Sequence, residues 1–99
     1  MSEKYIKTLI VDDSILFREV LSKLVAEDKA IDVIATAGDP YDARDKIIQL
    51  RPNVMTLDIE MPRMDGISFL KKLIPQYTIP VVVVTSLPIN AFEALDSGA

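Results

Sequence analysis

The sequence predicts an α/β fold organised around a doubly wound parallel sheet. Two short apolar runs, at residues 8–11 and Val54–Leu57, each end on acidic residues, as buried parallel strands do when they deliver side chains to one edge of a sheet. Stretches with apolar residues at three- and four-residue intervals separate the runs, which is the pattern of crossover helices. The 99 residues suffice for one such domain, so we expect residues 1–99 to form a single unit.

The first half of the chain predicts two strands and two helices in alternation. A strand over residues 7–11 precedes a helix over residues 14–28, and a half-buried strand near a sheet edge follows over Ile31–Ala37. The first helix is expected to face the sheet through four apolar residues: Phe17, Val20, Leu21 and Leu24. Its outer face carries five others: Arg18, Glu19, Ser22, Lys23 and Glu27. Asp39 then caps a second helix that has Pro40 at its first position.

The second half continues the alternation with one more helix and two more strands. The inner faces of the second and third helices comprise six apolar residues: Ala43, Ile47, Leu50, Leu70, Leu73 and Ile74. The third helix covers residues 67–74 and exposes Lys71 and Lys72. A β-branched run over residues 81–84 predicts a buried fourth strand, and only a short helix fits residues 88–97.

Three aspartates are expected to meet at the carboxyl edge of this sheet. With strand order 2-1-3-4, the crevice between the first and third strands receives Asp12, Asp13 and Asp58. Clustered carboxylates repel, and Mg²⁺, which prefers oxygen ligands, makes such a cluster tolerable. A carboxylate there can accept a phosphoryl group, with the Thr85 hydroxyl donating a hydrogen bond to one of its oxygens. The alternative is that these acids only end strands, and that Asp13 or Ser14 caps the first helix.

Composition excludes several classes of function. The net charge is -4 and the 11 basic residues are scattered, so we expect binding neither to nucleic acid nor to anionic membranes. Without cysteine or histidine the chain has no Ser-His-Asp or Cys-His hydrolase site and no cysteine zinc site. The N-terminal sequence M-S-E-K-Y-I-K-T has no long apolar region, so we expect no signal peptide or membrane span and a cytoplasmic location.

Four motifs, in this order along the chain, resemble the receiver domain of two-component response regulators, which has a flavodoxin-like fold. They are V-D-D-S at residues 11–14, L-D-I-E-M-P-R-M-D-G at residues 57–66, V-T-S at residues 84–86 and the terminal S-G-A. The second of these motifs, together with the F-L-K-K-L that follows it, is similar to the regulatory domain of the chemotaxis protein-glutamate methylesterase. The resemblance covers nearly the whole chain.

The resemblance implies a role for each candidate residue. Asp58 would be the phosphoacceptor, and Thr85 would be the switch hydroxyl. The ligands of Mg²⁺ would be Asp12, Asp13, Asp58 and the backbone carbonyl of Glu60. A histidine kinase of the chemotaxis type would supply the phosphoryl group, and phosphorylation would regulate a C-terminal methylesterase domain that this chain does not contain.

Receivers continue beyond S-G-A into a fifth strand, which carries an aromatic switch residue and a lysine, and into a fifth helix. Neither Lys71 nor Lys72 matches that lysine in position. We therefore expect a receiver domain that is truncated before its fifth strand and is phosphorylated in poor yield. The fourth strand is then expected to pair with that of a second copy, to exchange elements with it, or to be covered by residues 88–99 folding back.

Other functions stay open beside the phosphoacceptor. A phosphatase of the haloacid dehalogenase class also uses an aspartate and Mg²⁺, but it requires D-x-D where this chain has Asp12, Asp13 and Ser14. A receiver-like binding module would act through its surface without phosphotransfer, and a receiver of a different response regulator would control another output domain. A flavin-binding protein of the same fold is excluded, because the first loop is acidic where a flavin phosphate needs hydroxyl and N–H donors.

Overall fold

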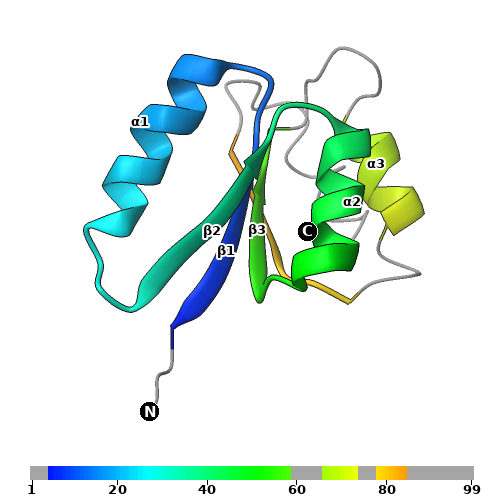
Figure 1. Ribbon diagram of the computed structural model, residues 1–99. Coiled ribbons are helices and arrows are strands. Elements are labelled where there is room, and N and C mark those ends of the chain that lie inside the picture. Colours follow the sequence, from blue (N-terminus) through cyan, green and yellow to red (C-terminus); the bar gives the residue numbers. More distant parts are fainter. Residues whose placement is uncertain (1–4, 59–65, 74–77, 85–99) are drawn as a thin grey trace.

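A computed structural model describes residues 5–58, 66–73 and 78–84, in which strands and helices alternate along the chain (Figure 1). The strands are β1 (Ile6–Val11), β2 (Ile31–Ala37), β3 (Val54–Leu57) and β4 (Val81–Val83). The helices are α1 (Ile15–Ala26), α2 (Pro40–Leu50) and α3 (Gly66–Leu73). The predicted alternation is confirmed as far as β4, and the short helix predicted at residues 88–97 lies outside the described residues.

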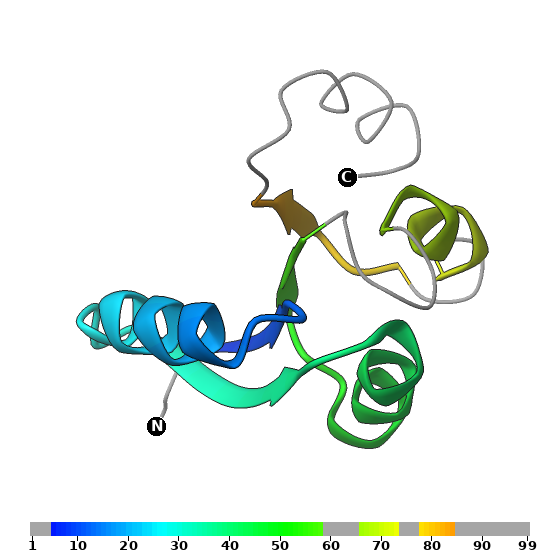
Figure 2. The same ribbon diagram turned by 90° about the horizontal axis from the view of Figure 1, so that it is seen from above.

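The four strands form a parallel sheet in the order β2-β1-β3-β4, as predicted. Strand β2 lies at one edge, in agreement with its half-buried residues. Helix α1 covers one face of the sheet, and α2 and α3 cover the other (Figure 2). This is the doubly wound, flavodoxin-like arrangement, in which the helices after β1 and β3 leave on opposite faces and open a crevice between these two strands.

The hydrophobic core lies between the sheet and the α2–α3 layer. Two rows of paired strand residues point into it: Ala35, Leu9, Met55 and Val81, and next to them Ala37, Val11, Leu57 and Val83. Ala43 and Ile47 of α2 pack on these rows as predicted, and so does Phe69 of α3, which the sequence analysis did not place inside. The prediction for Leu50 is wrong, because this side chain is exposed at the last turn of α2. The side chains of Leu70, Leu73 and Ile74 are outside the described set.

Local interactions set the two ends of α2. The Asp39 side chain accepts a hydrogen bond from the Asp42 N–H at 2.9 Å, so the predicted cap is confirmed, and Pro40 opens the helix. Arg51 ends the helix in the left-handed region at φ 50°, where its N–H still donates to the Ile47 carbonyl. Among the described helices, none has the length and apolar character that crossing a membrane requires.

Helix α1 is rotated relative to the prediction. None of its residues is fully buried, and four side chains are half-buried: Arg18, Leu21, Ser22 and Val25. Of the four residues predicted to face the sheet, only Leu21 is in this set, and the other three are exposed: Phe17, Val20 and Leu24. The prediction for those three is wrong because the period of the sequence locates an apolar stripe without fixing which side of it meets the sheet.

On the sheet face that α1 covers, only some of the side chains are buried by the residues that the structure describes. A row of paired residues crosses this face from Thr36 through Ile10 and Thr56 to Val82. Thr36 lies against α1 and Ile10 is fully buried, but Val82 is 52% exposed on β4, the last strand of the described sheet. Pairing of β4 with a second copy, or its covering by residues 88–99, stays a prediction.

Candidate metal centre

Three aspartates meet at the carboxyl edge of the sheet, where the sequence places them. Asp12 and Asp13 follow β1, Asp58 follows β3, and each residue offers a carboxylate oxygen within 4.8 Å of those of the other two. Sheet hydrogen bonds continue into the site: the Asp12 N–H donates to the Ala37 carbonyl and the Asp58 N–H to the Val11 carbonyl, both at 3.0 Å. The strands themselves therefore position two of the three carboxylates.

In the turn between β1 and α1, a serine and not one of the aspartates caps the helix. The Ser14 hydroxyl accepts a hydrogen bond from the Phe17 N–H at 3.1 Å, so Ser14 is the cap of α1. The Ser14 N–H in turn donates to Asp12 Oδ1 at 2.9 Å. The sequence left open whether Asp13 caps α1 or belongs to the acidic cluster. Because Ser14 caps the helix, the Asp13 carboxylate is available to the cluster.

The three carboxylates of the cluster repel one another when ionised, and one of them is buried. Asp12 is only 6% exposed, Asp58 is half-buried and Asp13 is exposed. Burial raises the pKa of Asp12 above its ordinary value, and the neighbouring Asp13 raises this pKa further, while the Ser14 N–H and the Arg18 charge act in the opposite direction. The ionised cluster is therefore costly to form without a cation.

We expect Asp12 to make the metal-free fold less stable as pH rises. Between the ordinary pKa of an aspartate and the raised pKa of Asp12, the folded protein binds more protons than the unfolded chain, so the free energy of unfolding falls with increasing pH. Below this window the penalty is absent, and above it the penalty is complete. Urea unfolding in chelator-treated buffer of constant ionic strength, from about pH 4 to about pH 7, should show a smaller fall for Asp12→Asn than for the unmodified chain.

Asp32→Asn is the matched control, because Asp32 is exposed on β2, and its profile should follow that of the unmodified chain. Indistinguishable profiles for Asp12→Asn and the unmodified chain would contradict the assignment of this pH dependence to Asp12.

The donor set fits Mg²⁺. All three candidate ligands are hard carboxylate oxygens, which Mg²⁺ prefers over nitrogen and sulfur donors. The exposed Asp13 leaves one side of the cluster open, as an ion that retains several waters requires. The positive charge would also offset the repulsion that burial of Asp12 intensifies. Glu60 and Thr85, the other two site residues predicted from the sequence, lie outside the described residues.

Arg18 is a site residue whose predicted position is wrong. It was assigned to the outer face of α1, yet it is half-buried and its Nη1 donates to the Asp12 carbonyl at 2.6 Å. The sequence does contain a signal, because Arg18 lies four residues after the cap Ser14 and thus on the same side of the first helical turn.

The family model of the response regulator receiver domain matches residues 8–99. The chain belongs to this family. Its strand order and its three clustered aspartates are those that the resemblance implied. The receiver assignment therefore rests on the sequence match and on the fold together.

The relatives of this receiver domain include protein-glutamate methylesterases of chemotaxis. The chain is 57% identical over its whole length to protein-glutamate methylesterase/protein-glutamine glutaminase 2 of Syntrophomonas wolfei and spans 29% of that protein. Among solved structures, it matches the response regulator domain of Thermotoga maritima CheB with a TM-score of 0.89 and 38% identity, over 96% of this chain and 74% of the other. The predicted similarity to the regulatory domain of the methylesterase is confirmed.

A further solved relative contains ions. The chain matches the CheX–CheY–BeF3–Mg²⁺ complex from Borrelia burgdorferi with a TM-score of 0.83 and 30% identity, over 94% of this chain and 72% of the other.

Proposed function

We propose that this receiver domain accepts a phosphoryl group from a histidine kinase onto Asp58, with Mg²⁺ bound at the carboxylate cluster. The observation that carries the proposal is the meeting of Asp12, Asp13 and Asp58 within 4.8 Å at the ends of two adjacent parallel strands. The Borrelia burgdorferi relative, whose complex contains Mg²⁺ and BeF3, supports Mg²⁺ binding by this receiver domain.

The chemistry assigned to Asp58 is nucleophilic attack. A carboxylate oxygen of Asp58 forms a bond to the phosphorus of a phosphohistidine, the P–N bond breaks, and its electron pair remains on the imidazole nitrogen. Asp12, Asp13 and Asp58 would hold Mg²⁺, which would supply positive charge to offset that of the transferred group. The hydrogen bond from the Asp58 N–H to the Val11 carbonyl keeps the backbone of the nucleophile in the sheet, so that attack requires little reorganisation.

Two further residues, a kinase and an output domain belong to the same proposal. The Glu60 backbone carbonyl is a predicted further ligand of Mg²⁺, and Thr85 is the predicted hydroxyl that senses the phosphoryl group. The kinase is of the chemotaxis type and the output is a C-terminal methylesterase domain, as the likeness to the Syntrophomonas wolfei protein suggests.

A small phosphodonor tests the proposal directly. Incubation with acetyl phosphate and MgCl₂ should add one phosphoryl group, observed by intact mass, to a minor part of the sample, in line with the poor yield expected from the sequence. Hydroxylamine should remove this group because it cleaves acyl phosphates. A chain that binds Mg²⁺ but is never labelled, either by acetyl phosphate or by a kinase, would instead favour the receiver-like binding module.

Mg²⁺ should stabilise the fold, and loss of Asp13 should remove this stabilisation. An ion that binds only the folded chain adds about 1.4 kcal/mol at tenfold its dissociation constant. Thermal melts with increasing MgCl₂ should therefore shift upward for the unmodified chain and much less for Asp13→Ala, because a direct ligand is lost.

Asp45→Ala removes an exposed carboxylate of α2 and should leave the shift unchanged. NaCl at matched ionic strength separates binding from screening. Absence of any shift at millimolar MgCl₂ would count against the metal centre.

A further inference from the structure

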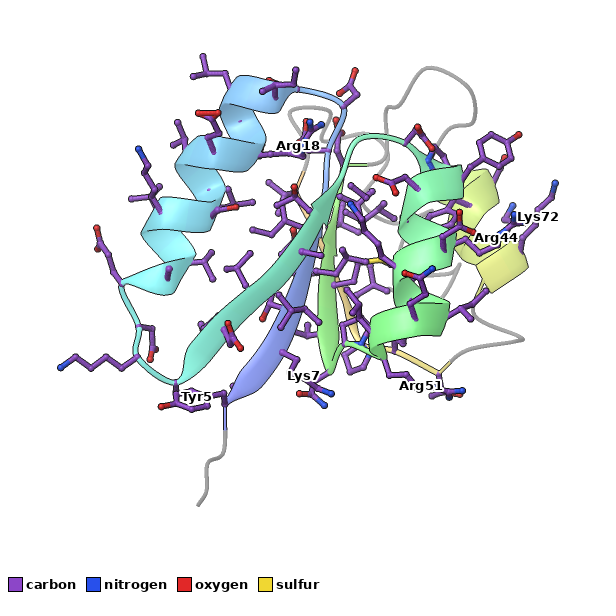
Figure 3. The ribbon with its side chains drawn as sticks, in the orientation of Figure 1. Tyr5, Lys7, Arg18, Arg44, Arg51 and Lys72 are labelled. Atoms are coloured by element: carbon purple, nitrogen blue, oxygen red, sulfur yellow. The ribbon has the colours of Figure 1, made fainter. Side chains whose placement is uncertain are left out.

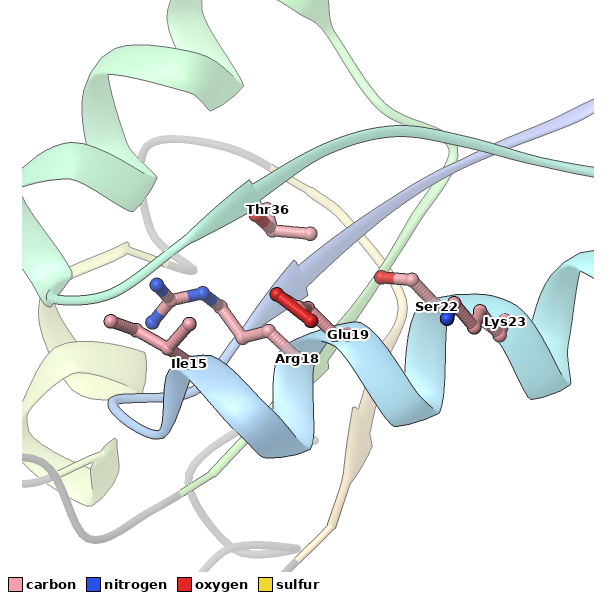
Figure 4. A pocket seen from close by; sticks show the side chains of 6 residues that line it. All are labelled: Ile15, Arg18, Glu19, Ser22, Lys23 and Thr36. Atoms are coloured by element: carbon pink, nitrogen blue, oxygen red, sulfur yellow. The ribbon is translucent and has the colours of Figure 1, made fainter.

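Arg18 connects the acidic turn to the neighbouring end of β2. Its Nη1 donates to the Asp12 carbonyl at 2.6 Å. Its stem runs along a cavity of about 390 Å³ between α1 and β2, beside Thr36 (Figure 4). Of the six residues labelled in Figure 3, Arg18 is the one near the carboxyl edge of the sheet, while Lys7 lies at the opposite end.

The guanidinium packs against Gly38, the residue directly after β2. A methyl group added to Gly38 would lie 2.8 Å from Nη1 of Arg18, closer than side-chain atoms approach one another, and 3.5 Å from its Cζ, which is an ordinary contact distance. The absence of a side chain at Gly38 therefore leaves the space in which the guanidinium sits. Arg18 thus contacts both the turn that follows β1 and the turn that follows β2.

The carbonyl that Arg18 binds belongs to the peptide joining two candidate ligands. Because a peptide unit is planar, holding the Asp12 carbonyl also fixes the Asp13 N–H and the position of the Asp13 Cα, from which its side chain leaves. The other backbone polar group of Asp12, its N–H, donates to the Ala37 carbonyl at 3.0 Å. The N–H bond ties Asp12 directly to the end of β2, and the carbonyl bond ties it to Arg18, which packs on Gly38 just after that strand.

The direct contact that Arg18 makes is a hydrogen bond to the backbone, and its charge acts on the Asp12 carboxylate without an ion pair. Within residues 5–58, 66–73 and 78–84, no carboxylate forms an ion pair with Arg18, and its donor is spent on a neutral carbonyl. A charge-assisted hydrogen bond of this kind is directional and costs more to lose than a neutral one.

We propose that Arg18 is a positioning residue, which clamps the Asp12–Asp13 peptide against Gly38 and holds both carboxylates ready for Mg²⁺. This inference rests on the metal site of the proposed function. Outer partners that orient metal ligands typically change metal affinity about 10-fold or more when they are removed.

Two substitutions disturb the clamp from opposite sides. Arg18→Ala removes the donor, whereas Gly38→Ala keeps the arginine but fills the space that its guanidinium occupies. Each should weaken Mg²⁺ binding, measured by calorimetric titration, by about 10-fold. In the Arg18→Ala background, Gly38→Ala should have almost no further effect, because the two changes act on one contact.

The control is Arg44→Ala, which removes the same charge from the exposed side of α2 and should leave Mg²⁺ affinity unchanged. Wild-type affinity in Arg18→Ala, or effects of the two substitutions that simply add, would overturn the proposal.

Amide exchange in the metal-free protein separates this inference from the metal site. Arg18→Ala should make the N–H groups of Asp12 and Ser14 exchange about 10-fold faster relative to the core N–H of Ile10, which reports global stability. If the unmodified chain binds no Mg²⁺ but this local acceleration occurs, the proposed function fails and the clamp stands. If the two N–H groups change only in proportion to Ile10, Arg18 contributes general stability and the clamp is refuted.

Discussion

Asp58→Asn should abolish labelling of the chain by acetyl phosphate. The amide has nearly the same size as the carboxylate but lacks its nucleophilic oxygen, so no acyl phosphate can form. The substitution also removes one of three mutually repelling charges, and we expect the metal-free fold to be as stable as before or more stable. Intact mass measured over a time course, together with urea unfolding of the same sample, would show that labelling is lost while the fold is retained.

Asp32→Asn is the matched control for this experiment. It makes the same chemical change on an exposed residue of β2, at the far edge of the sheet, and should leave the rate and extent of labelling unchanged. Labelling of Asp58→Asn to the extent of the unmodified chain would transfer the phosphoacceptor role to another residue, with Asp12 and Asp13 the first to examine by peptide mapping.

Ile47→Ala should cost about 2 to 5 kcal/mol of unfolding free energy. Ile47 is 2% exposed and belongs to the core cluster, which also contains Leu9 and Met55. Truncation loses the transfer free energy of the buried methyl groups and leaves a cavity that the strands beneath cannot fill. Since small domains have about 5 to 15 kcal/mol in total, the change is large enough to leave the chain only marginally folded.

The adjacent residue provides an internal comparison. Ile48→Ala makes the same substitution in the same helix with the same change in helix propensity, but Ile48 is 44% exposed. Its cost should stay below about 1 kcal/mol. Equal costs at the two positions, measured by urea unfolding, would show that α2 is rotated from the orientation described here.

Much of the fold could be predicted from local patterns. The bounds of β2 and β3 are those expected from the sequence, and α2 begins at the predicted cap Asp39 and ends at Arg51. These features are local, because a β-branched run favours an extended strand and an aspartate followed by proline favours a helix start whatever surrounds them. The acidic edge was predictable for a related reason, since parallel strands carry the residues that follow them to the same side of the sheet.

The orientation of α1 could not be predicted in the same way. The sequence shows an apolar stripe that includes Phe17 and Leu24, but these residues are exposed, and the half-buried apolar residues of α1 are Leu21 and Val25. Which side of a stripe is buried depends on where the helix lies over β1 and β2, and that position follows from packing between distant segments.

By itself, therefore, the sequence determined the succession of elements and the convergence of Asp12, Asp13 and Asp58 at one edge. Only the tertiary structure decided that Arg18 turns inward to the Asp12 carbonyl and packs on Gly38. An arginine has an apolar stem and a charged end, so it is compatible with solvent and with a half-buried groove alike. The turns that follow β1 and β2 determine the direction in which Arg18 points. They are separated by more than twenty residues in the chain, and the parallel pairing of β1 with β2 brings them together.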